Sequence, residues 1–485
     1  MRRQAAPGLW RRGRAVIGEP HPLDLSIPEA AIRLREGRLT ALRLAEAHLE
    51  RIERRNARLF AFTALARDPV LAAAEEADRA LAEGRDLGPL HGIPIAVKDL
   101  IDTADLRTAY GSRAFDGHVP QADAEVVRRL KANGAVMLGK VATYEFALVG
   151  PSRDASDPPA VNPWDSARIT GGSSSGSAAA VAGGLARAAI GTDTGGSVRS
   201  PAGYCGVVGL KPTFGRVPER GVYPLSPSLD TVGPLAATVE EAALVFSAIA
   251  DPAPPGWSPP PAEPRTIAYA RDWFATDPQA DPRIVAAMDD AASALSLAGY
   301  RIAEVSLPPY DLFEAAGALI LHAEALDVHR ALLAEKGELY GRPAFRSLVS
   351  GLCVGRRDLA LARRAADALT QALEETVFRR FDAMLTVATL TTAPASALFD
   401  GEAAVWTPMR TIPFNVSGHP ALALPAGFAD GLPVGLQIAG RRFGEETICR
   451  IGQVFEANTD HATRRPPPPP LPEGYAAAMG EGSEG

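Results

Sequence analysis

The amino-acid sequence predicts an α/β fold, because segments typical of buried strands alternate with segments typical of helices. Residues 93–98 form an apolar run that ends on Lys98 and are expected to be a strand. A helix is expected from Asp123 to the helix-breaking pair at residues 133–134, and a second strand follows at residues 135–138. This order of strand, helix and strand indicates a sheet with helices packed against it.

Three helices are expected before the first strand. Ser26 and Glu29 have the spacing of a capping box, which opens the first helix. Thr40 is the expected start of a second helix that ends near residue 55, and an alanine-rich third helix is expected over residues 68–84.

The second half of the chain repeats the alternation of strands and helices. Thr238 and Glu241 are expected to cap a helix that runs to about residue 250, and a proline-rich connection follows at residues 251–264. Strands are expected at residues 266–270, 301–305, 383–388, 421–428 and 432–439, and helices at residues 282–298, 358–379 and 445–456.

The composition is that of an ordinary globular protein. The chain has 485 residues, of which 46% are hydrophobic and 22% are charged, and its net charge of −7 argues against a nucleic-acid or anionic-membrane partner. No apolar stretch is long enough to cross a membrane, and no apolar signal-peptide core follows the N-terminal arginines, so we expect a cytoplasmic protein. Residues 1–22 and the proline-rich tail, 463–485, are expected to be disordered.

The cysteine and histidine residues do not form a metal-binding pattern. The three cysteines, Cys205, Cys353 and Cys449, are far apart, and the sequence contains neither a C-x-x-C pair nor an H-E-x-x-H motif. We therefore expect no metal and no cofactor.

Residues 169–180 are rich in glycine and serine and allow three interpretations. One is a flexible linker, although this segment leads directly into an apolar stretch of alanine and valine. A second is the G-x-S-x-G turn of α/β-hydrolases, with Ser174 as the nucleophile and His322, His329 or His419 as the base; the preceding residues do not resemble the strand that this motif requires. The third is a serine at a tight turn that opens a helix.

A second cluster of small residues lies at residues 188–202. A short apolar strand is expected to end at Gly191, and a helix led by Pro201 follows the turn. Successive backbone N–H groups from Thr194 to Ser197 can converge on one point, as an oxyanion hole requires. A simple glycine turn is the alternative, and the phosphate-loop pattern G-x-x-x-x-G-K-[ST] is absent.

Lys98 also has two interpretations. A lysine at the end of an apolar strand usually extends its ammonium group into solvent and is structural. If Lys98 is instead buried beside serine residues, loss of solvent lowers its pKa, and the neutral amine can act as a base toward a serine hydroxyl.

Together these segments resemble the amidase signature family. The family pattern G-G-S-S-G-G-S corresponds to residues 171–177, and G-[ST]-D-T-G-G-S-[IV]-R-x-P-A corresponds to residues 191–202. Other blocks that look like family motifs lie at residues 91–99, 205–212, 228–235, 414–420 and 431–438. The resemblance covers about residues 23–460 and implies a large mixed β-sheet flanked by helices on both faces, in one domain over residues 23–462.

The resemblance also implies roles for individual residues. Lys98 corresponds to the base of the family, Ser173 to its bridging serine, which follows a cis peptide bond, and Ser197 to its nucleophile. The oxyanion hole is expected to consist of the N–H groups of Thr194, Gly195, Gly196 and Ser197.

The expected pocket residues are Tyr144, Glu145, Phe146 and Ser174. Arg199 is a candidate either for binding a substrate carboxylate or for a structural salt bridge. Ser175 departs from the family pattern, which usually has glycine at this position.

The resemblance implies an amidase that hydrolyses a small-molecule carboxamide through a serine acyl-enzyme, and it leaves a homodimer open. The alternative is the glutaminase-type A subunit of a tRNA-dependent amidotransferase, which works with a second subunit. Residues 346–364 and the block 414–420, which contains His419, look more like those of free-standing amidases. A non-catalytic binding scaffold is a more remote alternative.

Overall fold

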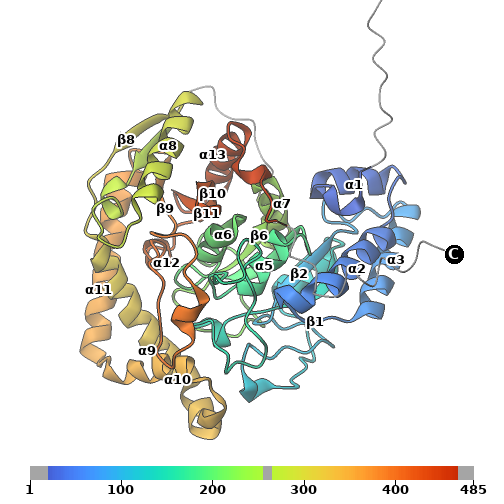
Figure 1. Ribbon diagram of the computed structural model, residues 1–485, viewed down its shortest axis with the longest axis horizontal. Coiled ribbons are helices and arrows are strands. Elements are labelled where there is room, and N and C mark those ends of the chain that lie inside the picture. Colours follow the sequence, from blue (N-terminus) through green and yellow to red (C-terminus); the bar gives the residue numbers. More distant parts are fainter. Residues whose placement is uncertain (1–19, 255–264, 468–485) are drawn as a thin grey trace, which may run out of the picture.

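The computed structural model describes residues 20–254 and 265–467 (Figure 1). Eleven strands form one sheet in the order β1-β3-β2-β4-β6-β5-β10-β11-β9-β7-β8. The strands are β1 (Phe62–Ala64), β2 (Pro94–Lys98), β3 (Val136–Val141), β4 (Ala188–Thr192), β5 (Val208–Lys211), β6 (Val232–Ala236), β7 (Thr266–Tyr269), β8 (Arg301–Glu304), β9 (Ala383–Val387), β10 (Ala421–Ala429) and β11 (Leu432–Gly440). The sheet is mixed, because β2 is parallel to β3 and β4, whereas each pair of neighbours from β4 to β9 in this order is antiparallel. The expected fold class is confirmed.

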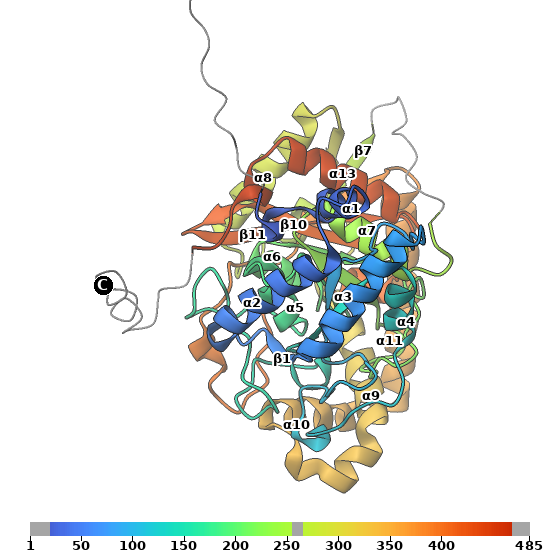
Figure 2. The ribbon, with the colours of Figure 1, turned by 90° about the vertical axis from the view of Figure 1, so that its right-hand side faces the viewer.

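Helices cover both faces of this sheet. Figure 2 shows α5 (Ser175–Ala182) and α6 (Arg199–Cys205) on one side of β10 and β11, and α8 (Pro282–Leu297) and α13 (Glu445–Ala457) on the other. The remaining helices on the β1 side are α1 (Ile27–Arg35), α2 (Ala41–Leu59), α3 (Arg67–Ala82) and α4 (Glu125–Ala132), and α7 (Val239–Ile249) packs against α13. On the opposite side of the molecule lie α9 (Tyr310–Lys336), α10 (Arg342–Val349), α11 (Arg356–Leu373) and the short α12 (Pro413–Val416) (Figure 1).

The capping residues correctly predicted where helices begin. Ser26 and Glu29 form a capping box at the start of α1, and Oγ1 of Thr40 accepts a hydrogen bond of 3.0 Å from the N–H of Arg43 at the start of α2. Helix α2 continues past its expected end near residue 55 and stops where Phe60 adopts a left-handed conformation with φ of 45°. Each strand and helix expected after residue 265 is present near its expected bounds, although α11 ends at Leu373 and the chain continues as a π-helical turn over Glu374–Phe378.

Helix α9, with 27 residues, is absent from the elements expected from the sequence. Its N-terminal half packs Phe313 into a cluster with Trp273 and Phe378, whereas Leu321 packs into a second cluster around Phe146. A helix that buries side chains on several sides has no single apolar stripe, so its helical period is hard to detect. The two clusters make α9 a wall of the region that contains the candidate catalytic residues.

Glycines allow α5 and α6 to approach the sheet closely. Gly203 in α6 faces Gly435 in β11, and a Cβ atom on Gly435 would lie 2.6 Å from the Cα of Gly203. Gly176 in α5 packs against Ala142, the residue that follows β3, and a Cβ on Gly176 would lie 2.2 Å from the backbone nitrogen of Ala142. Because α5 and α6 begin directly after the turns that contain Ser173 and Ser197, this packing positions those turns against the sheet.

Among the described residues, no helix has the length and apolar character needed to cross a membrane. The segments 1–22 and 463–485, expected to be disordered, lie largely outside the described residues, and so does most of the expected connection at 251–264.

The close approach of α6 and β11 should make the stability of the fold sensitive to a side chain at Gly435. Gly435→Ala should lower the free energy of unfolding by about 1–3 kcal/mol, because the added methyl group must displace the backbone of Gly203. Thermal and urea denaturation measure the change. Gly401→Ala is the control, because a Cβ at Gly401 has only one atom within 4 Å, at 4.0 Å. Equal stability of the two variants would contradict the close-packing interpretation.

Candidate active site

Lys98 is the last residue of β2, and its side chain is completely buried. Nζ donates hydrogen bonds to Oγ of Ser173 at 2.8 Å and to Oγ1 of Thr192 at 2.7 Å. Burial lowers the pKa of Lys98 to about 7, although the negative charges of Asp193 and Asp230 oppose this shift. The structure therefore places a lysine that loses its proton near neutral pH beside a serine hydroxyl.

Ser173 lies in the turn that precedes α5, and the Gly172–Ser173 peptide bond is cis. Its carbonyl oxygen accepts a hydrogen bond of 3.0 Å from the N–H of Tyr144. The next residue, Ser174, donates its N–H to the carbonyl oxygen of Ser197 at 3.1 Å. The two serine turns are thus joined through their backbones, and the structure brings Lys98, Ser173 and Ser197 into one site.

The structure does not support Ser174 as the nucleophile of a G-x-S-x-G turn. Ser174 is fully buried, and its Oγ exchanges hydrogen bonds of 3.1 and 3.2 Å with the backbone of Thr192. The three histidines considered as its base have other partners: His322 contacts Ser347, His329 contacts Tyr340, and His419 contacts Ser417 and Glu374. The expected place of Ser174 in the pocket wall is corrected for the same reason.

Ser197 lies in the turn between β4 and α6 and lines a cavity together with Thr194 and Gly195. The expected set of four oxyanion donors is reduced to three, because the N–H of Gly196 donates to Oδ1 of Asp193 at 2.9 Å. The N–H groups of Thr194, Gly195 and Ser197 have no hydrogen-bond acceptor among the described residues. These three groups remain available to a ligand.

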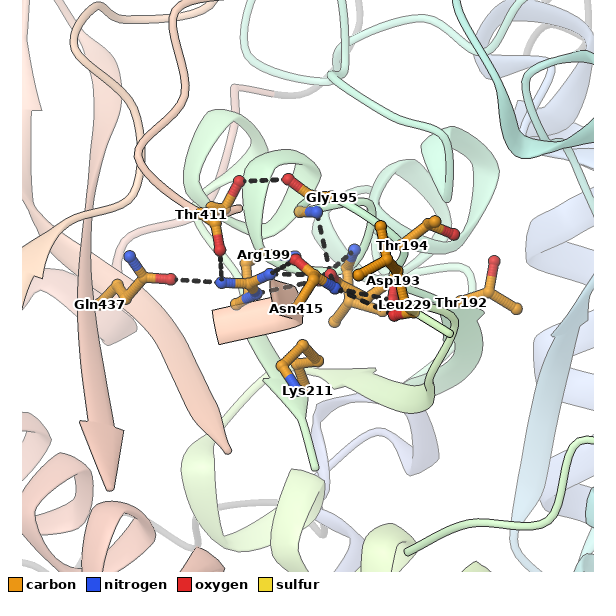
Figure 3. Close-up of polar contacts among 12 residues, drawn as sticks. Thr192, Asp193, Thr194, Gly195, Arg199, Lys211, Leu229, Thr411, Asn415 and Gln437 are labelled. Atoms are coloured by element: carbon orange, nitrogen blue, oxygen red, sulfur yellow. Dashed lines mark hydrogen bonds and ion pairs between the residues drawn. The ribbon is translucent and has the colours of Figure 1, made fainter. Parts of the chain in front are cut away.

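A buried ion pair holds this turn in place (Figure 3). The guanidinium of Arg199 contacts Oδ1 of Asp193 at 2.8 Å, and both side chains are completely buried. The Asp193 carboxylate also accepts the N–H of Val198 and an N–H of the Asn415 side chain. Burial alone would raise the pKa of Asp193, but the positive charge of Arg199 and the hydrogen bonds lower it far below the usual range.

Arg199 has no free donor directed at the cavity. Besides Asp193, it donates to the carbonyl oxygen of Thr411, to Oε1 of Gln437 and to Oδ1 of Asn415, each at 2.7 Å. Of the two roles expected for Arg199, the structure supports the salt bridge. The cluster is completed by three residues that the sequence did not single out: Asp193, Asn415 and Gln437.

Asp230 supports the opposite side of the same turn. One carboxylate oxygen accepts the hydroxyl of Thr194 at 2.5 Å, and the other accepts the N–H groups of Leu225 and Ser226. Leu225 also lines the cavity. Asp230 therefore connects the turn that contains Ser197 to another part of the cavity wall.

The cavity beside Ser197 is narrow, with a volume of about 40 Å³. Tyr144 lines it, as expected, but Glu145 and Phe146 do not. Glu145 is buried and accepts hydrogen bonds from Oγ of Ser112 and from the N–H of Gly341, and Phe146 is buried in an aromatic cluster. The left-handed conformation of Phe146 (φ of 50°) turns its ring into the core, which explains why sequence adjacency to Tyr144 was misleading.

In the part of the chain that the structure describes, no group of three or more histidine, cysteine, aspartate or glutamate residues could hold a metal ion.

The sequence matches the amidase family over residues 43–449, so the chain belongs to this family. Several solved structures share the fold. A structure described as an amidase superposes with a TM-score of 0.82 and 32% identity, covering 89% of this chain and 99% of that one. The peptide amidase from Stenotrophomonas maltophilia superposes with a TM-score of 0.78 and 31% identity, covering 93% and 99% of the two chains. The chain is thus an amidase signature enzyme in family and fold.

Curated relatives carry a more particular name. The A subunit of glutamyl-tRNA(Gln) amidotransferase from Chloroflexus aggregans is 38% identical over 480 residues, which cover 91% of this chain and 98% of the relative. The corresponding protein of Symbiobacterium thermophilum is 37% identical, and the match covers 89% and 96% of the two chains.

Loss of the buried ion pair between Asp193 and Arg199 should destabilise the folded protein. Asp193→Asn should lower the free energy of unfolding by about 3–5 kcal/mol, because Arg199 would remain buried without its counter-charge. The pKa of Asp193 is lowered, so its contribution should be complete above the ordinary carboxyl pKa of about 3.9 and should be lost only as the pH falls toward the lowered value. Denaturation between pH 5 and pH 8 should therefore give a constant difference from the unmodified protein.

Asp327→Asn is the control for this measurement. Asp327 pairs with Arg330 at 2.9 Å, but both side chains are exposed, so the expected loss is below about 1 kcal/mol. Equal losses in the two variants would contradict the supporting role of Asp193.

Proposed function

We propose that the chain hydrolyses a carboxamide to a carboxylate and ammonia or an amine, with Ser197 as the nucleophile. The observation that supports this most strongly is the contact between the buried Lys98 amine and the Ser173 hydroxyl, in a turn joined to that of Ser197. A neutral amine can accept a proton, whereas a serine hydroxyl needs such a partner to become a good nucleophile.

In the proposed mechanism, Lys98 takes a proton from Ser173 while Ser173 takes the proton of Ser197. Oγ of Ser197 then forms a bond to the amide carbon, and the N–H groups of Thr194, Gly195 and Ser197 stabilise the negative oxygen. The C–N bond breaks as Ser173 returns a proton to the leaving nitrogen. Water hydrolyses the resulting ester through the same proton relay, which restores Ser197 and releases the carboxylate.

A second candidate is the glutaminase-type A subunit of an amidotransferase. The curated relatives with that name favour it, because their 37–38% identity extends over nearly the whole of both chains. In that case the ammonia would pass to a second protein. The solved structure of the A subunit of glutamyl-tRNA(Gln) amidotransferase from Thermotoga maritima also shares the fold, with a TM-score of 0.72 and 30% identity, and the match covers 90% of this chain and 95% of that one.

A non-catalytic scaffold is a weaker candidate. A binding protein does not require a buried lysine beside a serine hydroxyl, together with three backbone N–H groups that have no acceptor among the described residues. These features argue against a scaffold and leave two enzymatic candidates, of which hydrolysis by the single chain is the proposed function and the amidotransferase role the second candidate.

A covalent probe tests the proposed nucleophile. A fluorophosphonate should add one adduct to the purified chain, and the adduct should be absent from Ser197→Ala because only the activated hydroxyl reacts. Intact-protein mass spectrometry measures the adduct, and the same single chain should release ammonia from simple amides without tRNA or a partner protein. Ser174→Ala is the control and should still be labelled. Labelling that survives in Ser197→Ala, or hydrolysis that requires a second protein, would contradict the proposal.

A further inference from the structure

The cavity beside Ser197 is lined by apolar side chains from distant parts of the chain. The segment before α5 contributes Leu148 and Val149, helix α9 contributes Leu321, and the segment before α12 contributes Trp406 and Met409. None of the described residues that line this cavity has a charged side chain. Its side-chain polar groups are the hydroxyls of Tyr144, Thr194, Ser197 and Thr407 and the indole N–H of Trp406.

Charged residues that adjoin the lining residues in the sequence are bound elsewhere. Glu145, next to Tyr144, accepts hydrogen bonds from Ser112 and Gly341. Arg410, next to Met409, is 5% exposed, pairs with Asp277 and donates to the carbonyl oxygen of Trp273.

Asp230 is similarly occupied, by the hydroxyl of Thr194 and two backbone N–H groups. A carboxylate or ammonium group of a bound molecule would therefore meet no free counter-charge in the cavity. Transfer of an unpaired charge from water into such a site is strongly unfavourable.

From this geometry we propose that the site selects uncharged amides with a short apolar acyl group and rejects amides whose acyl group carries a carboxylate or ammonium group. This inference rests on the proposed hydrolysis at Ser197 and specifies its substrate class. It separates the two candidate functions, because glutamine carries both an α-carboxylate and an α-ammonium group. The polar end of the substrate is the amide itself, whose oxygen faces the N–H groups of Thr194, Gly195 and Ser197.

The dimensions of the cavity restrict the acyl group further. A volume of about 40 Å³ favours a short acyl chain over a bulky one. Trp406 is 47% exposed and contacts His322 edge-on, so its ring lies between the cavity and solvent. We expect this indole to pack against the acyl chain.

A matched series of five-carbon amides tests the proposal on the full-length chain. The series comprises pentanamide, 5-aminopentanamide, 5-amino-5-oxopentanoate and L-glutamine, which differ in charge more than in size. The kcat/KM for pentanamide should exceed that for each charged amide on the order of 100-fold, because the charged group loses its water without gaining a partner. Ammonia release measures all four substrates in one assay.

The outcomes separate this inference from the proposed function. If glutamine or another charged amide is hydrolysed within tenfold of pentanamide, the substrate class is wrong while hydrolysis at Ser197 stands. If no amide is hydrolysed and the fluorophosphonate does not label Ser197, the proposed function fails and the inference fails with it.

Trp406→Ala tests the wall of the cavity independently of charge. It should raise KM for pentanamide about tenfold with a smaller change in kcat, because the indole binds the acyl chain but does not touch the reacting bonds. Leu398→Ala is the control, since Leu398 is 65% exposed and does not line the cavity. The same KM in Trp406→Ala, Leu398→Ala and the unmodified chain would overturn the assignment of this wall.

Discussion

The burial of Lys98 is the constraint on which the site depends. Strand β2 lies between β3 and β4, so the lysine at its end is covered on both sides and has two hydroxyl partners, those of Ser173 and Thr192. A buried ammonium group without a carboxylate in contact is costly, and the amine loses its proton more readily instead. The fold thereby produces a base near neutral pH from a residue that is ordinarily charged.

Asp193 and Arg199 are also buried, but unlike Lys98 they stay charged. Here both groups stay ionised because each satisfies the other, and the carboxylate also binds the backbone N–H groups of Gly196 and Val198. Charges paired in this way stabilise a single conformation of the turn. Because the N–H of Gly196 donates to Asp193, it is not available to a ligand. Its bond to Asp193 instead fixes the backbone from which the N–H groups of Thr194, Gly195 and Ser197 extend.

The sequence predicted those features whose determinants are close together in the chain. Capping residues such as Thr40 located helix starts, and the resemblance to the amidase signature family pointed to Ser173 and Ser197. It could not reveal α9, whose apolar residues face several neighbours, nor the partners of Arg199, because Asn415 and Gln437 lie more than 200 residues away. The inward turn of Phe146 depends on a backbone conformation that residue type does not indicate.

The protonation state of Lys98 tests the central claim most directly. The measurement uses NMR of protein that contains lysine labelled with ¹³C at Cε, in which the Lys98 signal is the one lost in Lys98→Arg. The Lys211→Met variant, which keeps that signal, is the control, because Lys211 is also buried and its pKa is also lowered to about 7. The account predicts that this signal titrates near pH 7 and that kcat/KM falls in parallel as the pH drops below that value. A signal that stays that of a charged amine up to the ordinary lysine pKa of about 10.4 would contradict it.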